Sequence, residues 1–473
     1  MKMKTSFAQN REDGSVLIVS LLISAIIGVT LASYLIMMQT QHASVARSQV
    51  WNASISLTEA GVEDALALLN KYAGDYDRLT NWNRGESLAA DNWSALSGNT
   101  YYVRRHLGGG YYDVYITNIN DTPIITSIGN VPWHYAYNNA SPPMVASAGA
   151  GLNYEPKWIA RTVEVKTKFD RLFAVAMAAV KVINLNGKGV ATDSFDSADP
   201  NYSDNGQYPM GQVNKTKANG DVVTPHTIID TLNVGNATVK GVVKTGPNGT
   251  ISILNGSVGD RAWVEGGNKG IQPGHSANDF NVVFDSVVLP DTTWLTIGQG
   301  YYDIDGLQYN YVFTSDNDGD YTIPGDFSNG IYVGTNAHVR LQVTSSVTIM
   351  NLEHDNIRIA SGGSLQIYML GETFKIAGRG VINDSGNAAA FTLYGLPSCT
   401  DIQFNGNGSF VGAIYAPQAA FSLGGGGNDW YDFIGASVTK TVQMNGHFRF
   451  HYDENLRRIG PGRGYIATNW KEL

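Results

Sequence analysis

Residues 15–38 read SVLIVSLLISAIIGVTLASYLIMM, and none of these twenty-four side chains is charged. About 20 consecutive apolar residues cross the hydrocarbon core of a bilayer as a helix. The next residues, QTQHASVARSQVWNASISLTEAGVEDALALLNKY from Gln39 to Tyr72, contain no Pro and carry apolar side chains at helical spacing. The sequence therefore predicts one long helix over residues 15–72, apolar and transmembrane in its first half and amphipathic in its second.

A short hydrophilic leader, residues 1–14, precedes the apolar run and ends in Gly14. A secretory signal has its small-residue cleavage site after the apolar segment, whereas here the small residue lies before it. The basic side chains Lys2, Lys4 and Arg11 favour a cytoplasmic N-terminus. We therefore expect a single-pass membrane protein whose body is extracytoplasmic. A plain signal anchor is the alternative.

Two segments, DGSVLIVSLLISAIIGVTLASYL and RSQVWNASISLTEAGVEDAL, resemble the N-terminal region of PilX-type minor pilins of type IV pili. Thr58 to Gly61 match the AEAG stretch of that family. The resemblance implies cleavage by prepilin peptidase between Gly14 and Ser15 and methylation of the new N-terminus. It also implies a bacterial inner-membrane location and assembly with other pilins or pseudopilins, and with them incorporation into a surface filament.

One position departs from the pattern of major pilins, which carry a Glu at the fifth mature position that pairs with a neighbour's N-terminal amine. Here that position is Val19. A carboxylate in the bilayer core is costly unless it is paired, so its absence fits a minor, capping or priming subunit. Val19, Glu59 and Glu63 are the candidate subunit contacts. For the two glutamates, a solvated helix face is the alternative.

The totals of the chain limit its partners and its means of stabilisation. It has 473 residues, a formal net charge of −9 and one cysteine, Cys399. That length suffices for two or three domains. The negative charge makes nucleic acid and anionic membrane surfaces poor partners, and one cysteine cannot form an intrachain disulfide.

Strand patterns begin after the helix. TYYVRRH (residues 100–106) and YYDVYITN (residues 111–118) flank three glycines and predict a hairpin. Strands over residues 122–131 and 160–169 follow, separated by a long loop over residues 132–156. We expect residues 73–170 to form a pilin-like head of the α+β class, in which a small antiparallel sheet covers the second half of the helix.

From Arg171 the sequence is all-β, with short apolar runs between Asn-Gly or Gly-rich turns. The tetrapeptide FVGA at residues 410–413 recurs as FIGA at residues 433–436, an offset of 23 residues. A period in the low twenties is typical of one coil of a β-solenoid, or β-helix, whose stacked coils share a core. We predict a β-solenoid over residues 171–457 and a tail without an assignable role over residues 458–473. An antiparallel β-sandwich is the alternative.

Three segments of this part resemble an uncharacterised β-helical domain that is often fused to PilX-type N-termini: VINLNGKGVATDSFDS (residues 182–197), FVGAIYAPQAAFSLGG (residues 410–425) and TVQMNGHFRFHYDENL (residues 441–456). The end motif of that domain is His-Tyr-Asp followed closely by Leu, here His451 to Asp453 and Leu456. We interpret residues 193–197 as a turn that leads into the solenoid. His447 and His451 are interpreted as polar strand residues or hydrogen-bonding end caps.

The sequence carries no recognisable catalytic motif, because it lacks GxSxG, HExxH and a phosphate-binding glycine loop ending in Lys-Ser or Lys-Thr. We therefore expect no enzyme. The best ion candidate is TSDNDGDYT, in which Asp316, Asp318 and Asp320 alternate as in a calcium loop. The Gly and Glu of a full loop are replaced by Tyr321 and Phe327. Calcium is the one cofactor that the sequence suggests. The alternative interpretation of this segment is a plain hairpin tip without an ion.

Aromatic residues beside polar turns suit stacking on surface glycans, with packing under loops as the alternative. They are Trp294, Tyr301, Tyr302, Tyr309, Tyr311, Trp430 and Tyr431. Taken together, the sequence predicts a minor pilin-like structural subunit of a type IV pilus or a related secretion pseudopilus. It would display a large β domain for assembly, capping or adhesion. The alternatives are a membrane-anchored β-helix enzyme or binding module acting on polysaccharide, and a signal-anchored surface protein unrelated to pili.

Overall fold

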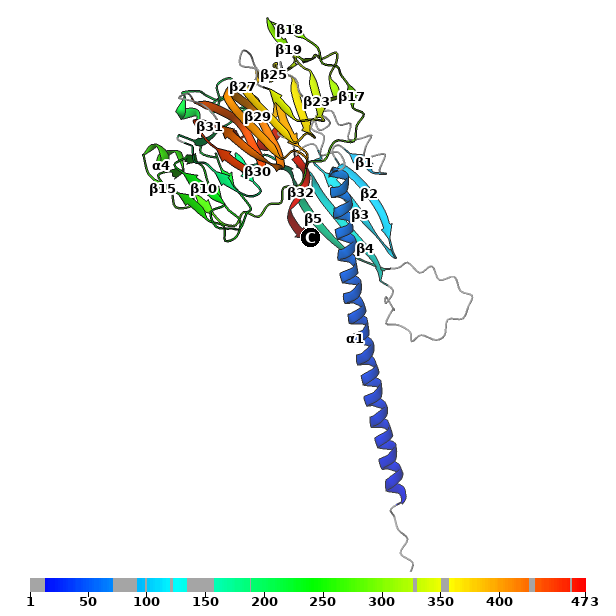
Figure 1. Ribbon diagram of the computed structural model, residues 1–473. Coiled ribbons are helices and arrows are strands. Elements are labelled where there is room, and N and C mark those ends of the chain that lie inside the picture. Colours follow the sequence, from blue (N-terminus) through cyan, green and yellow to red (C-terminus); the bar gives the residue numbers. More distant parts are fainter. Residues whose placement is uncertain are drawn as a thin grey trace, which may run out of the picture. The chain divides into compact units, whose positions relative to one another are not determined.

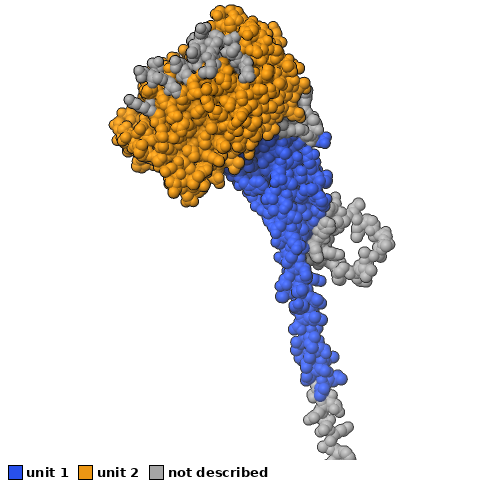
Figure 2. Space-filling view, viewed as in Figure 1, with its two compact units in different colours: residues 1–73, 77–169, 464–473 blue, residues 74–76, 170–463 orange. Residues whose placement is uncertain are grey.

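The computed structural model describes residues 13–70, 92–97, 100–119, 122–133, 157–187, 189–325, 330–349, 357–424, 430–459 and 462–473. The chain divides into two compact units (Figure 2). Unit 1 comprises residues 1–73, 77–169 and 464–473, and unit 2 comprises residues 74–76 and 170–463. Residues 1–12 of the expected leader, and residues 134–156 of the expected loop, lie outside the described residues.

Unit 1 begins with α1 (Asp13–Asn70), a single helix of 58 residues (Figure 1). At 1.5 Å per residue it is about 87 Å long. Every side chain from Val16 to Met37 is exposed. By length and composition, α1 is the one helix among the described residues that could cross a membrane. The prediction of a long helix with an apolar first half is confirmed.

A six-stranded sheet completes unit 1, in the order β1 (Ser94–Ser97), β2 (Thr100–Leu107), β3 (Gly110–Thr117), β4 (Ile124–Trp133), β5 (Lys157–Arg171) and β32 (Gly462–Glu472). From β1 to β5, neighbouring strands pair antiparallel. The predicted hairpin is confirmed as β2 and β3, with Leu107 opposite Gly110.

The prediction of a tail over residues 458–473 is wrong, because β32 is the sixth strand of this sheet and lies next to β5. Arg161 forms an ion pair with Glu472 at 2.6 Å, and the Leu473 N–H donates to the carbonyl of Thr162 at 3.0 Å. An edge strand has unpaired backbone groups that a further strand can satisfy. Nothing local in the sequence shows that β5 would leave such an edge for residues almost 300 positions later.

The second half of α1 packs on one face of this sheet, close to its backbone. A Cβ on Gly61 would lie 2.3 Å from the Ser127 Oγ and 2.8 Å from the Val114 Cγ2. On the sheet side, a Cβ on Gly129 would lie 2.2 Å from the Ser54 carbonyl oxygen. Glycine at both positions therefore permits the close approach. The core contains Leu57, Val62, Ala65 and Leu69 from the helix and Val114, Ile116, Ile125, Val163 and Val165 from the sheet.

Most of the regular structure of unit 2 is strand. A first run contains β6 (Met177–Ala179), β7 (Ile183–Asn184), β8 (Ala191–Phe195), β9 (Val222–Val223), β10 (Leu232–Gly235), β11 (Thr238–Lys240), β12 (Val243–Lys244), β13 (Ile251–Ile253), β14 (Ser257–Gly259), β15 (Gly270–Ile271) and β16 (Ser276–Ala277). A second run contains β17 (Leu295–Thr296), β20 (Tyr311–Phe313), β21 (Gly319–Ile323), β22 (Ile331–Val333), β23 (His338–Val343), β24 (Val347–Ile349), β25 (Ile357–Ile359), β26 (Ser364–Met369), β27 (Thr373–Asn383), β28 (Phe391–Gly395), β29 (Asp401–Gly424), β30 (Tyr431–Met444) and β31 (Phe448–Asp453). The remaining elements are the hairpin β18 (Tyr302–Ile304) and β19 (Leu307–Tyr309), and the short helices η1 (Val213–Lys215), α4 (Arg261–Glu265), η2 (Ala388–Ala390) and α5 (Leu456–Ile459).

The two runs form one sheet of 24 strands in which residues of like kind stack in register. Ile331, Ile357, Val381, Phe410, Phe433 and Phe450 are successive parallel partners. The ring of Phe433 stacks on that of Phe410 at 4.3 Å and on that of Phe450 at 4.4 Å. The repeat noted in the sequence is this register, since Phe410 to Ala413 pair with Phe433 to Ala436.

The pairing within this sheet is parallel, which is incompatible with the antiparallel sandwich. The order of the strands also differs from their order in the chain. After Phe450 of β31 the next partner is Thr192 of β8, followed by Val239 and Val258. The last strands of the second run therefore pair with the first strands of the first run. We call this junction, formed by β30 and β31 with β6, β7 and β8, the seam.

Candidate functional site

The seam holds the densest group of buried charged side chains among the described residues of unit 2. Strand β31 pairs parallel with β8, so that His451 lies beside Asp193, Tyr452 beside Ser194 and Asp453 beside Phe195. The same three-residue segment carries the His-Tyr-Asp motif. The motif therefore occupies one of the two strands by which the second run joins the first.

His451 is buried, with 3% of its side chain exposed, and it is held on both ring nitrogens. Its Nδ1 lies 2.6 Å from the Asp193 Oδ1 in β8, and its Nε2 lies 3.0 Å from the Asp432 Oδ1 in β30. The ring of Tyr208 stacks on the imidazole at 3.6 Å, and the Tyr208 hydroxyl donates to the Asp193 Oδ2 at 3.0 Å. One histidine thus bridges strands from both runs beneath an aromatic cover.

Burial alone would lower the pKa of His451, because it disfavours the charged imidazolium. The carboxylates of Asp193 and Asp432 outweigh burial and raise the pKa of His451 to about 9. The imidazole is therefore charged at neutral pH and forms a buried ion pair with both acids. Burial and the Asp193 carboxylate together raise the pKa of Tyr208, so its hydroxyl stays protonated and remains a donor.

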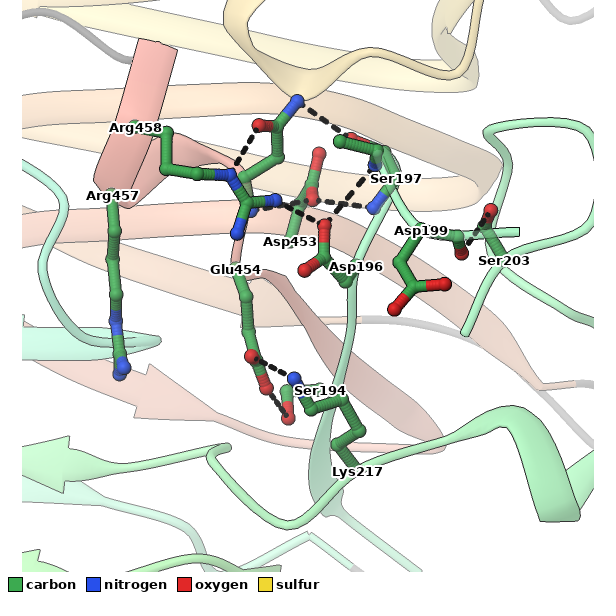
Figure 3. Close-up of polar contacts among 12 residues, drawn as sticks. Ser194, Asp196, Ser197, Asp199, Ser203, Lys217, Asp453, Glu454, Arg457 and Arg458 are labelled. Atoms are coloured by element: carbon green, nitrogen blue, oxygen red, sulfur yellow. Dashed lines mark hydrogen bonds and ion pairs between the residues drawn. The ribbon is translucent and has the colours of Figure 1, made fainter. Parts of the chain in front are cut away.

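A second set of contacts is centred on Glu454, directly after β31 (Figure 3). Its Oε1 accepts from the Ser194 hydroxyl at 2.8 Å and from the Asn219 Nδ2 at 2.6 Å. Its Oε2 forms an ion pair with Lys217. The Asn219 N–H donates in turn to the Ser194 Oγ at 2.9 Å. Glu454 therefore ties the end of the second run to the loop that follows β8.

A third set joins the same loop to α5 (Figure 3). Arg458 forms an ion pair with Asp196, and the Asp453 Oδ1 accepts from the Ser197 N–H at 3.1 Å and from the Asn455 N–H at 3.0 Å. Burial alone would raise the pKa of Asp196, but the hydrogen bond from Arg458 lowers it. Burial raises the pKa of Asp453, which is fully buried.

The arrangement is suited to holding strands together rather than to proton transfer. A general base needs a free lone pair within reach of a substrate, and both nitrogens of His451 are occupied inside the protein. The Tyr452 hydroxyl is also occupied inside the protein, since it donates to the Phe173 carbonyl at 2.6 Å. Leu456, the last residue of the motif, is fully buried. Across the described residues, no group of three or more His, Cys, Asp and Glu is placed to hold a metal ion.

The interpretation of residues 193–197 as a turn is wrong in its first half, because Ala191 to Phe195 form strand β8. His451 does lie on a strand and forms hydrogen bonds, as expected, but the sequence did not show with which residues. Asp193 and His451 are 258 positions apart. The signal that could have linked them is that both fall in segments with the same family resemblance.

Val19, Glu59 and Glu63 of α1 are exposed, whereas Thr58 and Gly61 pack on the sheet. Gly14 and Ser15 lie in the first turn of α1, and 56% of Val19 is exposed. Glu59 and Glu63 are exposed, which is compatible both with contact to a neighbouring subunit and with a solvated helix face. Within the AEAG-like stretch, Gly61 packs on the sheet and the Thr58 hydroxyl accepts from the Gly129 N–H at 3.1 Å. This stretch therefore has a packing role.

The three aspartates of the calcium candidate do not converge. Asp316 and Asp318 are exposed in the turn before β21, whereas Asp320 forms an ion pair with Arg340 of β23 and accepts from the Thr292 hydroxyl at 2.7 Å. A calcium ion takes six to eight oxygen ligands. Two exposed carboxylates alone supply few of them, so calcium at this turn remains a prediction that the geometry does not favour.

The aromatic candidates divide by exposure. Tyr309, Tyr311 and Tyr431 are buried, and Trp294 packs edge-on against Tyr368 at 6.0 Å. Tyr301, Tyr302 and Trp430 are exposed by 78%, 44% and 44%. Packing therefore accounts for the first four, and only the last three offer a ring to a ligand.

Among known protein families, a match is found for one part of the chain. A family described as "Domain of unknown function (DUF7305)" matches residues 277–459. Those residues contain the second run, the His-Tyr-Asp motif and α5, and they leave out nearly all of the first run. None of the curated proteins matches the chain.

Among solved structures, the chain is similar to the competence-associated pilin ComZ from Thermus thermophilus. The sequence identity is 10%, and the similarity covers 90% of this chain and 97% of that one at a TM-score of 0.25. At that TM-score the likeness assigns neither a fold nor a function to this chain.

Proposed function

We propose that this chain is a minor pilin-like subunit, made as a prepilin, that displays a β-helical domain outside the cell. In this proposal prepilin peptidase cuts between Gly14 and Ser15, and the new N-terminus is methylated. The mature helix then lies in the bacterial inner membrane among the helices of other pilins or pseudopilins. The role is structural and adhesive rather than enzymatic, within a type IV pilus or a related secretion pseudopilus.

The observation that carries the proposal is the division of α1 into two halves. All side chains from Val16 to Met37 are exposed and uncharged, which is unfavourable in water and favourable in lipid or against like helices. The other half packs on its own sheet through Gly61 and Thr58. One rigid element can thus be anchored in a membrane or filament while it carries a folded body.

The β-helical description of unit 2 is supported by the parallel register of its strands. The columns that pass through Ile331, Phe410 and Phe433 are those expected of stacked coils. The lack of an acid at Val19 supports a capping or priming position, because such a subunit has no neighbour above it to supply the pairing amine. Glu59 and Glu63 remain candidate contacts with neighbouring subunits.

The processing step gives the most direct test. The full chain is produced with and without prepilin peptidase, and its N-terminus is determined by sequencing and intact mass. We expect a start at N-methylated Ser15 only when the peptidase is present, and no cleavage in a Gly14→Leu variant. A Gly28→Leu variant is the matched control, since it changes a glycine inside the apolar run and should still be cut. An intact Met1 in the presence of the peptidase contradicts the proposal.

The adhesive role is tested in the cell. Deleting the gene should leave surface filaments in place or reduce their number while abolishing attachment to surfaces. A chain truncated after unit 1 is not a suitable control, because β32 of unit 1 follows unit 2 in the sequence. Full retention of attachment without this chain contradicts the adhesive role and leaves the processing result unaffected.

Calcium is tested separately. If the turn at Asp316 and Asp318 binds the ion, millimolar calcium raises the melting temperature of the full chain, and an Asp318→Ala variant loses that shift. An unchanged melting temperature removes calcium from the proposal.

A further inference from the structure

A row of side-chain amides lies on the outward side of three adjacent strands at the seam. In β30, β7 and β10 the buried partners Val442, Ile183 and Leu232 stack in register. The residue after each of them points to the opposite side. These residues are Gln443, Asn184 and Asn233, which are also in register and partly exposed.

Two further amides extend the row at the strand ends, Asn445 and Asn186, and both are exposed. The Gln443 Nε2 donates to the Asn445 Oδ1 at 2.7 Å, and the Asn233 Nδ2 donates to the Asn186 Oδ1 at 3.1 Å. The Asn233 Nδ2 also donates to the Asn184 Oδ1 at 3.4 Å, and Asn184 lies beside Gln443 in the register, so the five residues form one continuous set. We call Gln443, Asn445, Asn184, Asn186 and Asn233 the amide row.

The contacts within the row leave several donors unused. The Oδ1 atoms of Asn184, Asn186 and Asn445 accept hydrogen bonds, whereas their Nδ2 groups donate none within the part of the chain that is described. An amide has two N–H donors and one acceptor oxygen. The row therefore presents free donors to the outside on consecutive strands.

An exposed indole lies at the turn beside the row. Trp430 covers Gly189, three residues after Asn186, so closely that a Cβ on Gly189 would lie 2.0 Å from the indole Cη2. The His447 ring, two residues after Asn445, lies 5.0 Å away, and the Arg449 guanidinium lies 4.4 Å from the indole centroid. Trp430 is thus fixed in position while 44% of it remains exposed.

We propose that the amide row and Trp430 bind a neutral polysaccharide chain. Amides donate and accept hydrogen bonds as sugar hydroxyls do, and an aromatic ring beside polar groups packs against an apolar sugar face. The five side chains of the row are all neutral, and Arg449 beside them lies over the Trp430 ring, so amides rather than cations supply most of the polar groups and favour a neutral chain over a polyanion. Its strands are about 4.8 Å apart, and so its donors recur at intervals that suit a polymer of repeating hydroxyl groups.

The proposal deepens the adhesive role proposed above and rests on it. It also depends on the seam, because Gln443 and Asn445 come from the second run and the three other amides from the first. A run folded alone would carry only part of the site. The aromatic residues of the sequence suggest this class of ligand but not its location, since Asn184 and Gln443 are more than 250 positions apart in the chain.

The test uses the full chain in detergent micelles and electrophoresis through gels that contain a polysaccharide. The neutral probes are hydroxyethylcellulose, dextran and mannan, and the anionic probe is polygalacturonate. We expect retardation by at least one neutral polymer. Asn186→Asp, which keeps the shape and the acceptor but removes the donor, should weaken binding about threefold to tenfold. Trp430→Ala should weaken binding by a similar factor.

Tyr301→Ala is the matched control, because it removes an exposed aromatic ring away from the row and should leave binding unchanged. Melting temperatures establish that each variant is folded. The proposal is overturned if no neutral polymer is bound, if polygalacturonate is bound more tightly, or if Asn186→Asp and Trp430→Ala bind as the unaltered chain does. None of these results affects cleavage at Gly14, so failure here is distinguishable from failure of the pilin-like proposal.

Discussion

At the scale of single residues, the protein depends on a few positions whose neighbours leave little freedom. His451 is the clearest, since it is buried between two carboxylates from different strands. Removing one partner of a buried ion pair leaves an uncompensated charge and is strongly destabilising. Gly61 is the second, because the helix meets the sheet at its Cα.

His451 should make stability depend on pH on the alkaline side. Its pKa is raised from 6.5 to about 9, so the folded chain binds the proton more tightly than the unfolded chain. The resulting stabilisation, on the order of 3 kcal/mol, is fully present below pH 6.5 and is lost as the pH rises through 9. We expect the melting temperature of unit 2 to fall over that range, and to fall much less in His451→Gln.

The exposed His338 provides the control for this experiment. A His338→Gln variant should keep the full alkaline slope, because that side chain is exposed and its Nδ1 lies 2.8 Å from the Ser364 Oγ at the surface. A melting temperature that is constant from pH 6.5 to 9.5 in the unaltered chain contradicts a protonated His451.

Gly61→Ala should destabilise unit 1 by about 1 to 3 kcal/mol, since the added methyl group would overlap the Ser127 hydroxyl and a methyl group of Val114. The measurement is urea unfolding of the full chain in detergent, followed by circular dichroism. Gly28→Ala is the matched control, because a Cβ there meets nothing within 4 Å. Equal stability of the two variants would show that the helix does not approach the sheet as described.

At the scale of elements, the contacts of the Glu454 side chain attach the end of β31 to β8 and to the loop that follows it. Its side chain is 8% exposed and that of Lys217 is 27% exposed, so the ion pair is largely shielded from water. The hydroxyl of Ser194 and the side-chain amide of Asn219 donate further hydrogen bonds to the carboxylate. The loop after β8 is therefore fixed by a segment more than 230 residues later in the chain.

Lys217→Met should lower the stability of unit 2 by about 2 to 4 kcal/mol, because Glu454 would then keep its buried charge without a cation. Differential scanning fluorimetry measures the change. Combining it with Glu454→Gln should recover part of the loss, since the amide carries no charge. If the double variant is no more stable than Lys217→Met alone, the two groups are not coupled.

The elements also show what the sequence could and could not reveal. Local signals were sufficient for α1, for the hairpin of β2 and β3, and for the register of Phe410 on Phe433. The spacing of the phenylalanine column varies, from 29 residues between Val381 and Phe410 to 17 between Phe433 and Phe450. A search for a repeat of fixed length therefore finds only the 23-residue interval from Phe410 to Phe433 and misses the others. The joining of β31 to β8 and of β32 to β5 depends on partners far away in the chain and leaves no local pattern.

At the scale of the whole molecule, two strands near the C-terminus pair with strands that lie much earlier in the sequence. Strand β31 pairs with β8 within unit 2, and β32 is the last strand of the sheet of unit 1, beside β5. Such long-range pairing must wait until the late segments exist, and contacts of this kind slow folding. Until then β6, β7 and β8 are edge strands with unpaired backbone groups.

A chain that ends at residue 429 should therefore be degraded readily within residues 171–277, because β30 and β31, which pair with one edge of β6, β7 and β8, are missing. The full chain should resist the same protease at the same concentration. Mass spectrometry of timed digests gives the sites of cleavage. Equal resistance of residues 171–277 in both chains would show that the first run is stable without the seam.

The phenylalanine column has a consequence for how the gene can change. Phe410, Phe433 and Phe450 keep their register although the loops between them differ in length. Codons gained or lost between the strands are absorbed there, and duplication of one whole interval adds another ring to the column without disturbing the register of its neighbours. A single codon inserted inside a strand instead reverses which side chains face the interior beyond it. Relatives of this chain are expected to differ in length mainly between strands and by whole intervals of the column.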